Sequence, residues 1–376
     1  MSPVHNFNAG PAMLPPPVLE QVQAELRDYQ GRGMSIMEMS HRSREYEAVN
    51  SQAEATFKRL LGLGDGYRVL FLQGGASTQF AMLPMNFLPP HPNPSPPGGE
   101  GLGVRGGSAD YLMTGSWAEK AYEEAAALGQ ARIVASTKED GYRRVPRPEE
   151  IKLSDGPAYV HLTSNETIQG IQWHRFPDVG NRPLVADMSS DILSRPFDAS
   201  KFALIYAGAQ KNLGPSGVTA VLLREAWLEK ANKKVPTMLR YATHVKNSSL
   251  YNTPPSFGVY VLNLVLQWID QLGGLGAMAE RNARKAKTLY DAIDQSGGFY
   301  RGHALPEARS QMNITFRLPS EALEKQFVAE AQAAGMVGLA GHRSVGGARA
   351  SVYNAVSPES CQALASFMAD FARKHG

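Results

Sequence analysis

The sequence predicts an α/β protein: a large domain built on a mainly parallel, doubly wound sheet, followed by a smaller α+β domain. Three observations support this. Between residues 68 and 223, short apolar runs alternate with helical patterns, which is typical of a parallel sheet covered by helices. After Gly297-Gly298 the order changes to strand, helix, strand, helix. The length of 376 residues also exceeds that of a typical single domain.

The strands expected in the large domain are mostly short and nearly continuous in apolar residues, as strands buried on both faces should be. They cover residues 69–72, 132–135, 159–162, 184–186, 203–206 and 218–222. Helical patterns lie between several of them, for example at residues 77–86 and 117–128.

Two long helices, at residues 257–272 and 278–296, lead into the smaller domain. The expected elements there are strands at 312–317 and 349–353 and helices at 322–334 and 358–374. We therefore expect a large domain of residues 16–270 and a small domain that combines residues 1–15 with 271–376.

One segment fits neither pattern. Residues 89–108 contain six prolines and six glycines and almost nothing apolar. Such a composition buries too little surface to offset the entropy lost on ordering. We expect a surface loop or disordered insertion that stays outside any functional site.

Composition and charge exclude several classes of protein. The net charge is only +3, from 38 Lys and Arg against 35 Asp and Glu, which does not suggest a nucleic-acid surface. Cys361 is the single cysteine, so neither a disulfide framework nor a multi-cysteine zinc site is expected, and a reducing cytoplasmic setting fits best. No targeting segment is expected, and the most apolar stretch, residues 259–269, is too short to span a membrane.

A turn rich in small residues, at 73–78 (QGGAST), follows the first strand and opens a helix. Backbone N–H groups at such a helix start suit a phosphate. Glycines also occur there simply to make a tight turn, and the sequence leaves both interpretations open.

Two further strand ends carry charged residues. Asp187 ends an apolar strand, and Lys211 follows the next strand, 24 residues later. Asp187 could serve only to cap the following turn, and a lone lysine is usually a solvated charge. Together, however, an acid and a lysine at strand ends are what pyridoxal 5′-phosphate chemistry requires. The lysine bonds to the cofactor, and the acid keeps the pyridine nitrogen protonated.

At this point the chain resembles the phosphoserine aminotransferase family, within the class V, fold-type I pyridoxal-phosphate enzymes. Seven ordered blocks carry the resemblance, at residues 6–12 (NFNAGPA), 39–43 (MSHRS), 74–77 (GGAS), 165–170 (NETIQG), 208–212 (GAQKN), 251–255 (YNTPP) and 341–351 (GHRSVGGARAS). The match runs from residue 6 to the C-terminal helix and is interrupted at residues 89–108.

The resemblance implies a role for each matching residue. Lys211 and Asp187 are the implied catalytic residues, with Trp117 stacked on the cofactor ring and Thr167 bonded to its phenolic oxygen. The cofactor phosphate would be held by Ala76, Ser77 and Gln210, with Asn252 and Thr253 from a partner subunit. The substrate's phosphate would meet His41, Arg42, His342 and Arg343, some across a dimer interface, and its α-carboxylate would meet Arg349. No metal is implied.

The implied activity is reversible amino transfer between glutamate and 3-phosphohydroxypyruvate, giving phosphoserine and 2-oxoglutarate in serine biosynthesis by a homodimer. A parallel step on 4-phosphohydroxythreonine in pyridoxine biosynthesis is also open. Three alternatives remain: a serine–pyruvate or alanine–glyoxylate aminotransferase, which would have no use for two His-Arg pairs; a cysteine desulfurase, which Cys361 in a helical pattern does not favour; and a non-catalytic cofactor-binding homologue.

Overall fold

The computed structural model describes residues 4–88 and 107–376. The insertion expected at residues 89–108 therefore lies almost entirely outside the described residues.

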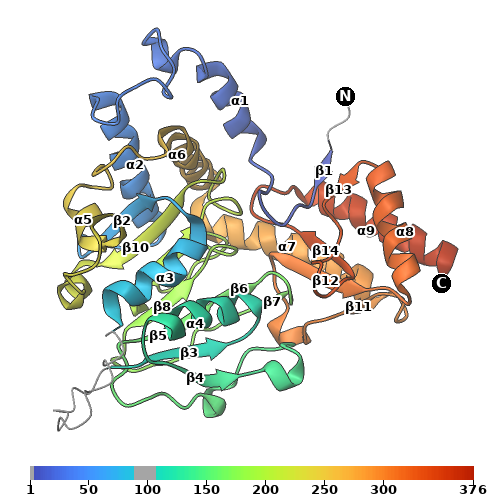
Figure 1. Cartoon of the computed structure of the whole chain (residues 1–376). Helices are drawn as coiled ribbons and strands as arrows, with labels where there is room; N and C mark the ends of the chain where they lie inside the picture. The colour runs from blue at the N-terminus through green and yellow to red at the C-terminus, as the bar shows by residue number, and fades with distance from the viewer. Residues whose placement is uncertain (1–3, 89–106) are drawn as a thin grey trace.

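A seven-stranded sheet forms the centre of the large part of the molecule (Figure 1). Its strands, in spatial order, are β2 (Tyr67–Leu72), β10 (Thr219–Arg224), β9 (Phe202–Gly208), β8 (Leu184–Asp187), β5 (Tyr159–Thr163), β3 (Ala109–Met113) and β4 (Ala131–Ser136). Strand β10 runs antiparallel to both of its neighbours, and the pairs from β9 to β4 are parallel. The predicted mainly parallel sheet is confirmed.

Helices cover both faces of this sheet. In β2, Leu70 and Leu72 face the cluster under α3 (Gly75–Phe87) and α4 (Ser116–Leu128), whereas Val69 and Phe71 face the cluster under α2 (Arg44–Leu60) and α6 (Ser256–Gln271). This alternation follows from the period of two in a strand. Helix α1 (Pro16–Glu25) packs against α6, and α5 (Tyr241–Lys246) lies beside β2.

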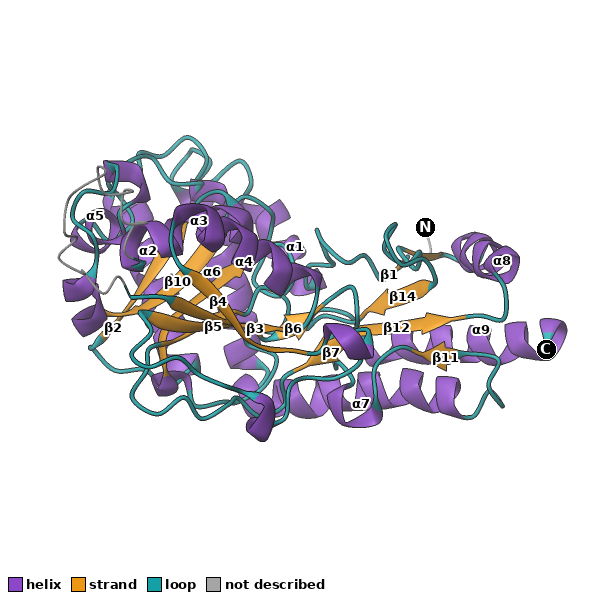
Figure 2. Cartoon of the chain, turned by 60° about the horizontal axis from the view of Figure 1, so that its bottom comes forward, coloured by secondary structure: helices purple, strands orange, loops and turns teal. Residues whose placement is uncertain are grey.

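The smaller part has its own core, which includes Phe7, Phe316 and Phe327. Its antiparallel sheet has the order β11 (Arg301–Gly302), β12 (Asn313–Arg317), β14 (Ala348–Ser351). Around it lie α7 (Gly274–Asp294), α8 (Glu321–Ala333) and α9 (Pro358–His375), and Figure 2 shows α7 and α9 side by side. Strand β1 (His5–Asn6) pairs with β13 (Met336–Val337), so the N-terminal residues join the C-terminal part.

Short elements complete the chain. A two-stranded hairpin of β6 (Asn165–Glu166) and β7 (Ile171–Gln172) lies where the two parts meet. Single-turn or short 3-10 helices occur at Tyr29–Gly31, Lys138–Asp140, Pro148–Glu150, Ala199–Lys201, Glu225–Lys230, Thr237–Leu239 and Pro306–Ala308. Among the described residues, no helix combines the length and the apolar character needed to cross a membrane.

The predicted elements were incomplete. Strand β3, the short strands β1, β6, β7, β11 and β13, and helices α1, α2 and α5 were not predicted. The helix predicted at 278–296 covers Gly274–Asp294, and the strand predicted at 349–353 covers Ala348–Ser351. Strand β3 was missed because it carries the buried acid Asp110, whose carboxylate accepts hydrogen bonds from Ser154 N and Oγ, both at 2.7 Å. That compensation comes from tertiary structure and cannot be seen in the local pattern.

Candidate active site

Lys211 lies in the turn after β9, inside the molecule. Its Nζ is 5.4 Å from the centre of the Trp117 ring, at the start of α4. Burial lowers the pKa of Lys211, and the negative charge of Asp187 partly opposes this shift. A desolvated lysine whose pKa is lowered is a better nucleophile, so the position suits covalent chemistry.

Asp187 is the buried last residue of β8. Its Oδ1 accepts hydrogen bonds from Ser189 N at 2.9 Å and Ser189 Oγ at 2.6 Å, and Ser189 Oγ accepts one from Gly208 N at 3.0 Å. Burial raises the pKa of Asp187, while the bonds from Ser189 and the charge of Lys211 lower it. Asp187 therefore does cap the next turn, and it also lies within electrostatic range of Lys211.

The turn predicted as a phosphate site opens α3. Gly74 and Gly75 have φ of 93° and 67°, a conformation that favours glycine. Ala76 is half-buried and Ser77 is exposed in the first turn of the helix. A helix start with exposed N–H groups is present where the sequence placed it.

Asn252 and Thr253 lie beside this turn in the same chain. Gln73 Nε2 is 3.5 Å from Thr253 O, and Gln73, Gly74 and Asn252 line a cavity of about 240 Å³. Gln210 follows β9 directly before Lys211, and its carbonyl accepts the N–H of Ala12 at 2.8 Å.

Trp117 and Thr167 contact each other directly. The Trp117 indole Nε1 donates a hydrogen bond to Thr167 Oγ1 at 2.9 Å. Lys120 Nζ lies over the same ring, 4.6 Å from its centre. Thr167 is buried and directly follows β6, so this hydrogen bond ties the Trp117 ring to the β6–β7 hairpin.

Arg349, on β14, reaches this site from the small part of the molecule. Its NH1 donates to the carbonyl of Thr167 at 3.1 Å, and its buried Nε has no hydrogen-bond partner within the part of the chain that the structure describes. Burial lowers the pKa of Arg349. A half-buried guanidinium without a carboxylate partner among residues 4–88 and 107–376 is unusual, because buried charges are normally paired.

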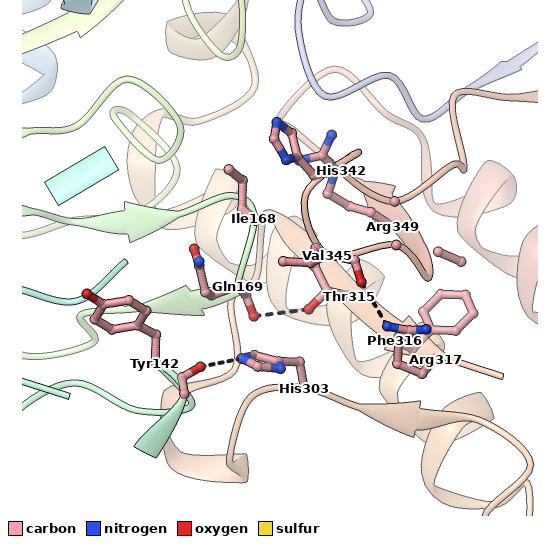
Figure 3. A pocket seen from close by; sticks show the side chains of 14 residues that line it. Tyr142, Ile168, Gln169, His303, Thr315, Phe316, Arg317, His342, Val345 and Arg349 are labelled. Carbon is pink, nitrogen blue, oxygen red and sulfur yellow. Dashed lines mark hydrogen bonds between the residues drawn. The ribbon is translucent and has the colours of Figure 1, made fainter. Parts of the chain in front are cut away.

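Figure 3 shows the cavity of about 420 Å³ beside Arg349, where the two parts meet. Arg349 and His342 lie at one end, near Ile168, and Tyr142 and His303 lie at the other. Burial lowers the pKa of His342, and the positive charges of Arg349, Arg343 and Lys120 lower it further. The cations around His342 favour an anion at this end of the pocket.

The structure does not bring every predicted site residue to this cavity. His41 and Arg42 directly precede α2 and are not among the residues that line it. His41 is half-buried and its Nε2 has no partner among the described residues, whereas Arg42 is exposed. The cavity of one chain thus receives His342 and Arg349, whereas the exposed Arg343 and both members of the first His-Arg pair are not among its lining residues.

Sequence reasoning missed Glu166 and Ser189. Glu166 is fully buried, and its carboxylate accepts hydrogen bonds from Trp117 N at 3.0 Å and Ala118 N at 2.9 Å. It lies inside the block at residues 165–170, where an acid between apolar runs was the available signal.

Comparisons with known proteins show the family to which the chain belongs. The family model described as "Aminotransferase class-V" matches residues 4–364. A phosphoserine aminotransferase of Herpetosiphon aurantiacus is 63% identical over 99% of both chains, and one of Bacillus subtilis is 52% identical over 98% of both. The solved structure of a phosphoserine aminotransferase from Bacillus circulans subsp. alkalophilus superposes with a TM-score of 0.94 at 58% identity and covers 100% of each chain. The chain is a pyridoxal-phosphate-dependent enzyme that belongs to the class-V aminotransferase family, among the phosphoserine aminotransferases.

Proposed function

We propose that this chain transfers the amino group of glutamate to 3-phosphohydroxypyruvate, reversibly, to give phosphoserine and 2-oxoglutarate in serine biosynthesis. Relatives named phosphoserine aminotransferase that match nearly the whole chain support this activity. The observation that carries the substrate class is the half-buried Arg349, which lies beside His342 and has no carboxylate partner among residues 4–88 and 107–376.

The residues present fit pyridoxal phosphate. A buried acid, a desolvated lysine, an aromatic ring and a helix start follow the carboxyl ends of β8, β9, β3 and β2, which lie at the same edge of the sheet. We expect Asp187 to pair with the pyridine nitrogen, Trp117 to stack on the ring, and Ala76, Ser77 and Gln210 to hold the phosphate. When bound, the cofactor supplies an electron sink for the charge that develops when the substrate loses its α-proton.

Lys211 has two tasks in this account. It holds the cofactor between turnovers, and once displaced by the substrate's amine it takes the α-proton as general base and returns a proton later. Its lowered pKa favours the neutral amine that both tasks need. The Trp117 ring on one side of Nζ limits where the amine can move.

Arg349 and the His342 region bind the two ends of the substrate. Arg349 can offer two parallel N–H donors to the α-carboxylate, a geometry that lysine cannot copy. We place the phosphate of phosphoserine, and the side-chain carboxylate of glutamate, near His342 and Arg343, whose positive surroundings suit either anion.

We further propose a homodimer with shared sites, acting in the cytoplasm. His41 and Arg42 lie outside the cavity of their own chain, so a partner chain is the available route by which they would reach a phosphate. We assign Asn252 and Thr253 to the cofactor phosphate of the partner from the family resemblance alone, because within one chain both lie beside the Gln73–Gly74 turn. A role in pyridoxine biosynthesis, through 4-phosphohydroxythreonine, is a second use that this anion pocket would permit.

The alternatives that the sequence left open are less favoured. The solved alanine–glyoxylate aminotransferase from Nostoc shares 16% identity and shows the common fold only. Cys361 is buried in α9 and burial raises the pKa of its thiol to about 11, which does not suit a desulfurase.

The test is amino transfer from phosphoserine to 2-oxoglutarate, with alanine as the unphosphorylated comparison. The wild type should transaminate phosphoserine, and Arg343→Ala should raise KM for phosphoserine about tenfold with a smaller effect on alanine. Arg301→Ala, at an exposed position on β11, is the matched control. A wild type that prefers alanine, or equal losses on both substrates, would contradict the proposal.

A further inference from the structure

Glu166 is a buried acid to which the account so far gives no task. It is fully buried, and its two carboxylate oxygens accept the N–H groups of consecutive residues: Oε2 from Trp117 at 3.0 Å and Oε1 from Ala118 at 2.9 Å. These N–H groups belong to the first turn of α4, where a helix leaves its donors unpaired. The carboxylate therefore clamps the start of the helix that carries Trp117.

Gly115 makes room for this clamp. A Cβ at Gly115 would lie 2.5 Å from the carboxyl carbon of Glu166. Its φ of 165° is extended backbone that any residue adopts, so the turn itself does not require glycine. Glycine at position 115 is therefore explained by the Glu166 carboxylate, which occupies the space that a side chain would need.

Thr167, the next residue, holds the same tryptophan at its other end. Its hydroxyl oxygen accepts the indole N–H, so the hydroxyl proton remains available to donate elsewhere. Two consecutive residues of β6 and the turn after it thus bind both the backbone and the ring of Trp117.

The position of Glu166 is electrostatically costly. Burial, with a smaller contribution from the charge of Asp187, raises the pKa of Glu166 to about 7, even though the two N–H bonds and the charge of Lys211 act to lower it. A buried carboxylate that lacks a salt bridge destabilises a fold unless its hydrogen bonds compensate. A purely structural helix start would be served at lower cost by serine or threonine.

We propose that Glu166 is a positioning residue for the cofactor site: its carboxylate sets the entry of α4, and thereby the plane of the Trp117 ring and the hydrogen bond by which Thr167 is oriented toward the cofactor. This inference rests on the assignment of Trp117 and Thr167 to the cofactor ring and not on the identity of the substrate.

Two variants test it by different routes. In Glu166→Gln one of the two acceptor oxygens becomes an NH₂ group. This group cannot accept a hydrogen bond, so it faces the backbone N–H of Trp117 or Ala118 as one donor against another. In Gly115→Ala the carboxylate keeps its charge but is displaced. Both variants should raise the dissociation constant for pyridoxal phosphate about tenfold, measured by titrating the apoprotein and following absorbance and tryptophan fluorescence. The double variant Gly115→Ala/Glu166→Ala should bind pyridoxal phosphate only slightly more weakly than Glu166→Ala alone. In the double variant the carboxylate with which the new methyl group would clash is absent.

Asp110→Asn is the matched control. Asp110 is another buried carboxylate that accepts two hydrogen bonds, from Ser154, but it lies near the opposite end of β3 from the site. Its replacement should lower the melting temperature and leave the dissociation constant for pyridoxal phosphate within about twofold of the wild type.

The inference is overturned if Glu166→Gln binds pyridoxal phosphate as tightly as the wild type, or if Asp110→Asn weakens binding equally. Normal cofactor binding by the wild type without phosphoserine turnover would contradict the proposed function instead and leave the role of Glu166 standing.

Discussion

Lys211, Asp187 and Glu166 are three ionisable residues buried in one site, and their pKa values move toward each other. Burial lowers the pKa of the lysine and raises that of both acids. The attraction between Lys211 and the two carboxylates opposes these shifts. Opposed shifts of this kind are common where groups exchange protons at neutral pH, which is the task proposed for Lys211.

The substitution Asp187→Asn separates the capping of the next turn from the proposed pairing with the pyridine nitrogen. The amide oxygen can still accept the bonds from Ser189, so the turn should survive, but the negative charge is lost. We expect kcat for phosphoserine to fall about a hundredfold or more while pyridoxal phosphate still binds. Near-normal turnover would mean that Asp187 only caps the turn.

At the scale of single residues, the sequence could predict those site residues that directly follow apolar strands. Asp187 and Lys211 follow apolar runs, so their meeting at the carboxyl edge of the sheet could be inferred. The role of Glu166 could not, because its partners lie 48 and 49 residues away along the chain. That Arg349 has no carboxylate partner among the described residues likewise depends on which groups the fold brings near it.

At the scale of elements, the start of α3 depends on two glycines that differ in their surroundings. A Cβ at Gly74 would collide with the side chain of Thr78, whereas a Cβ at Gly75 would meet nothing within 4 Å. Both residues have positive φ, so both substitutions bring backbone strain, but one also brings a clash.

Gly74→Ala should therefore weaken pyridoxal phosphate binding more than Gly75→Ala does. The strain alone costs about 1 kcal/mol, and the clash must also displace the turn whose N–H groups we assign to the phosphate. Equilibrium titration of both apoproteins with the cofactor measures the difference. Equal effects of the two substitutions would remove this turn from the phosphate site.

Elements were predictable where pattern and burial agreed. The apolar strands and the long helices were found because each buries a continuous face. Helix α2 was missed although Ser43 caps it and Glu45 and Glu47 lie in its first turn, a signal that was present in the sequence.

At the scale of the whole molecule, a buried polar network joins the β6–β7 hairpin to the antiparallel sheet of the smaller part. Asn165 Nδ2 donates to Asn313 Oδ1 at 2.8 Å, and Asn313 Nδ2 donates to Ser351 Oγ at 3.0 Å. Ser351 ends the strand that carries Arg349, so the network sets the distance between that arginine and the cofactor site. We propose that the chain divides into domains at residues 15/16 and 270/271, with this network across the junction.

Lys285 is fully buried in the small part, and its protonation should make the free energy of unfolding depend on pH. Its Nζ donates to Val352 O at 2.9 Å and Tyr353 O at 2.7 Å, and burial lowers its pKa to about 7. Between about pH 7 and the usual pKa of a lysine, the unfolded chain holds the proton that the folded chain has released. The contribution of Lys285 to stability therefore rises with pH across this window.

From pH 7 to pH 9 the gain should be about 2 kcal/mol in the free energy of unfolding, and it should vanish in Lys285→Met. Urea unfolding of wild-type and Lys285→Met apoprotein at pH 7 and pH 9 measures this gain. Subtracting the change seen in the variant from that seen in the wild type cancels the contributions of other titrating groups. The same pH dependence in both proteins would show that Lys285 keeps its proton when folded.

The central claim is that Lys211 bonds to pyridoxal phosphate in an aminotransferase site. Its most direct test is reduction of the cofactor-loaded protein with borohydride, followed by peptide mass spectrometry. The account predicts that the cofactor mass is found on Lys211 and that Lys211→Ala, still folded by circular dichroism, retains none and does not transaminate phosphoserine. Labelling of another lysine, or turnover by Lys211→Ala, would contradict it.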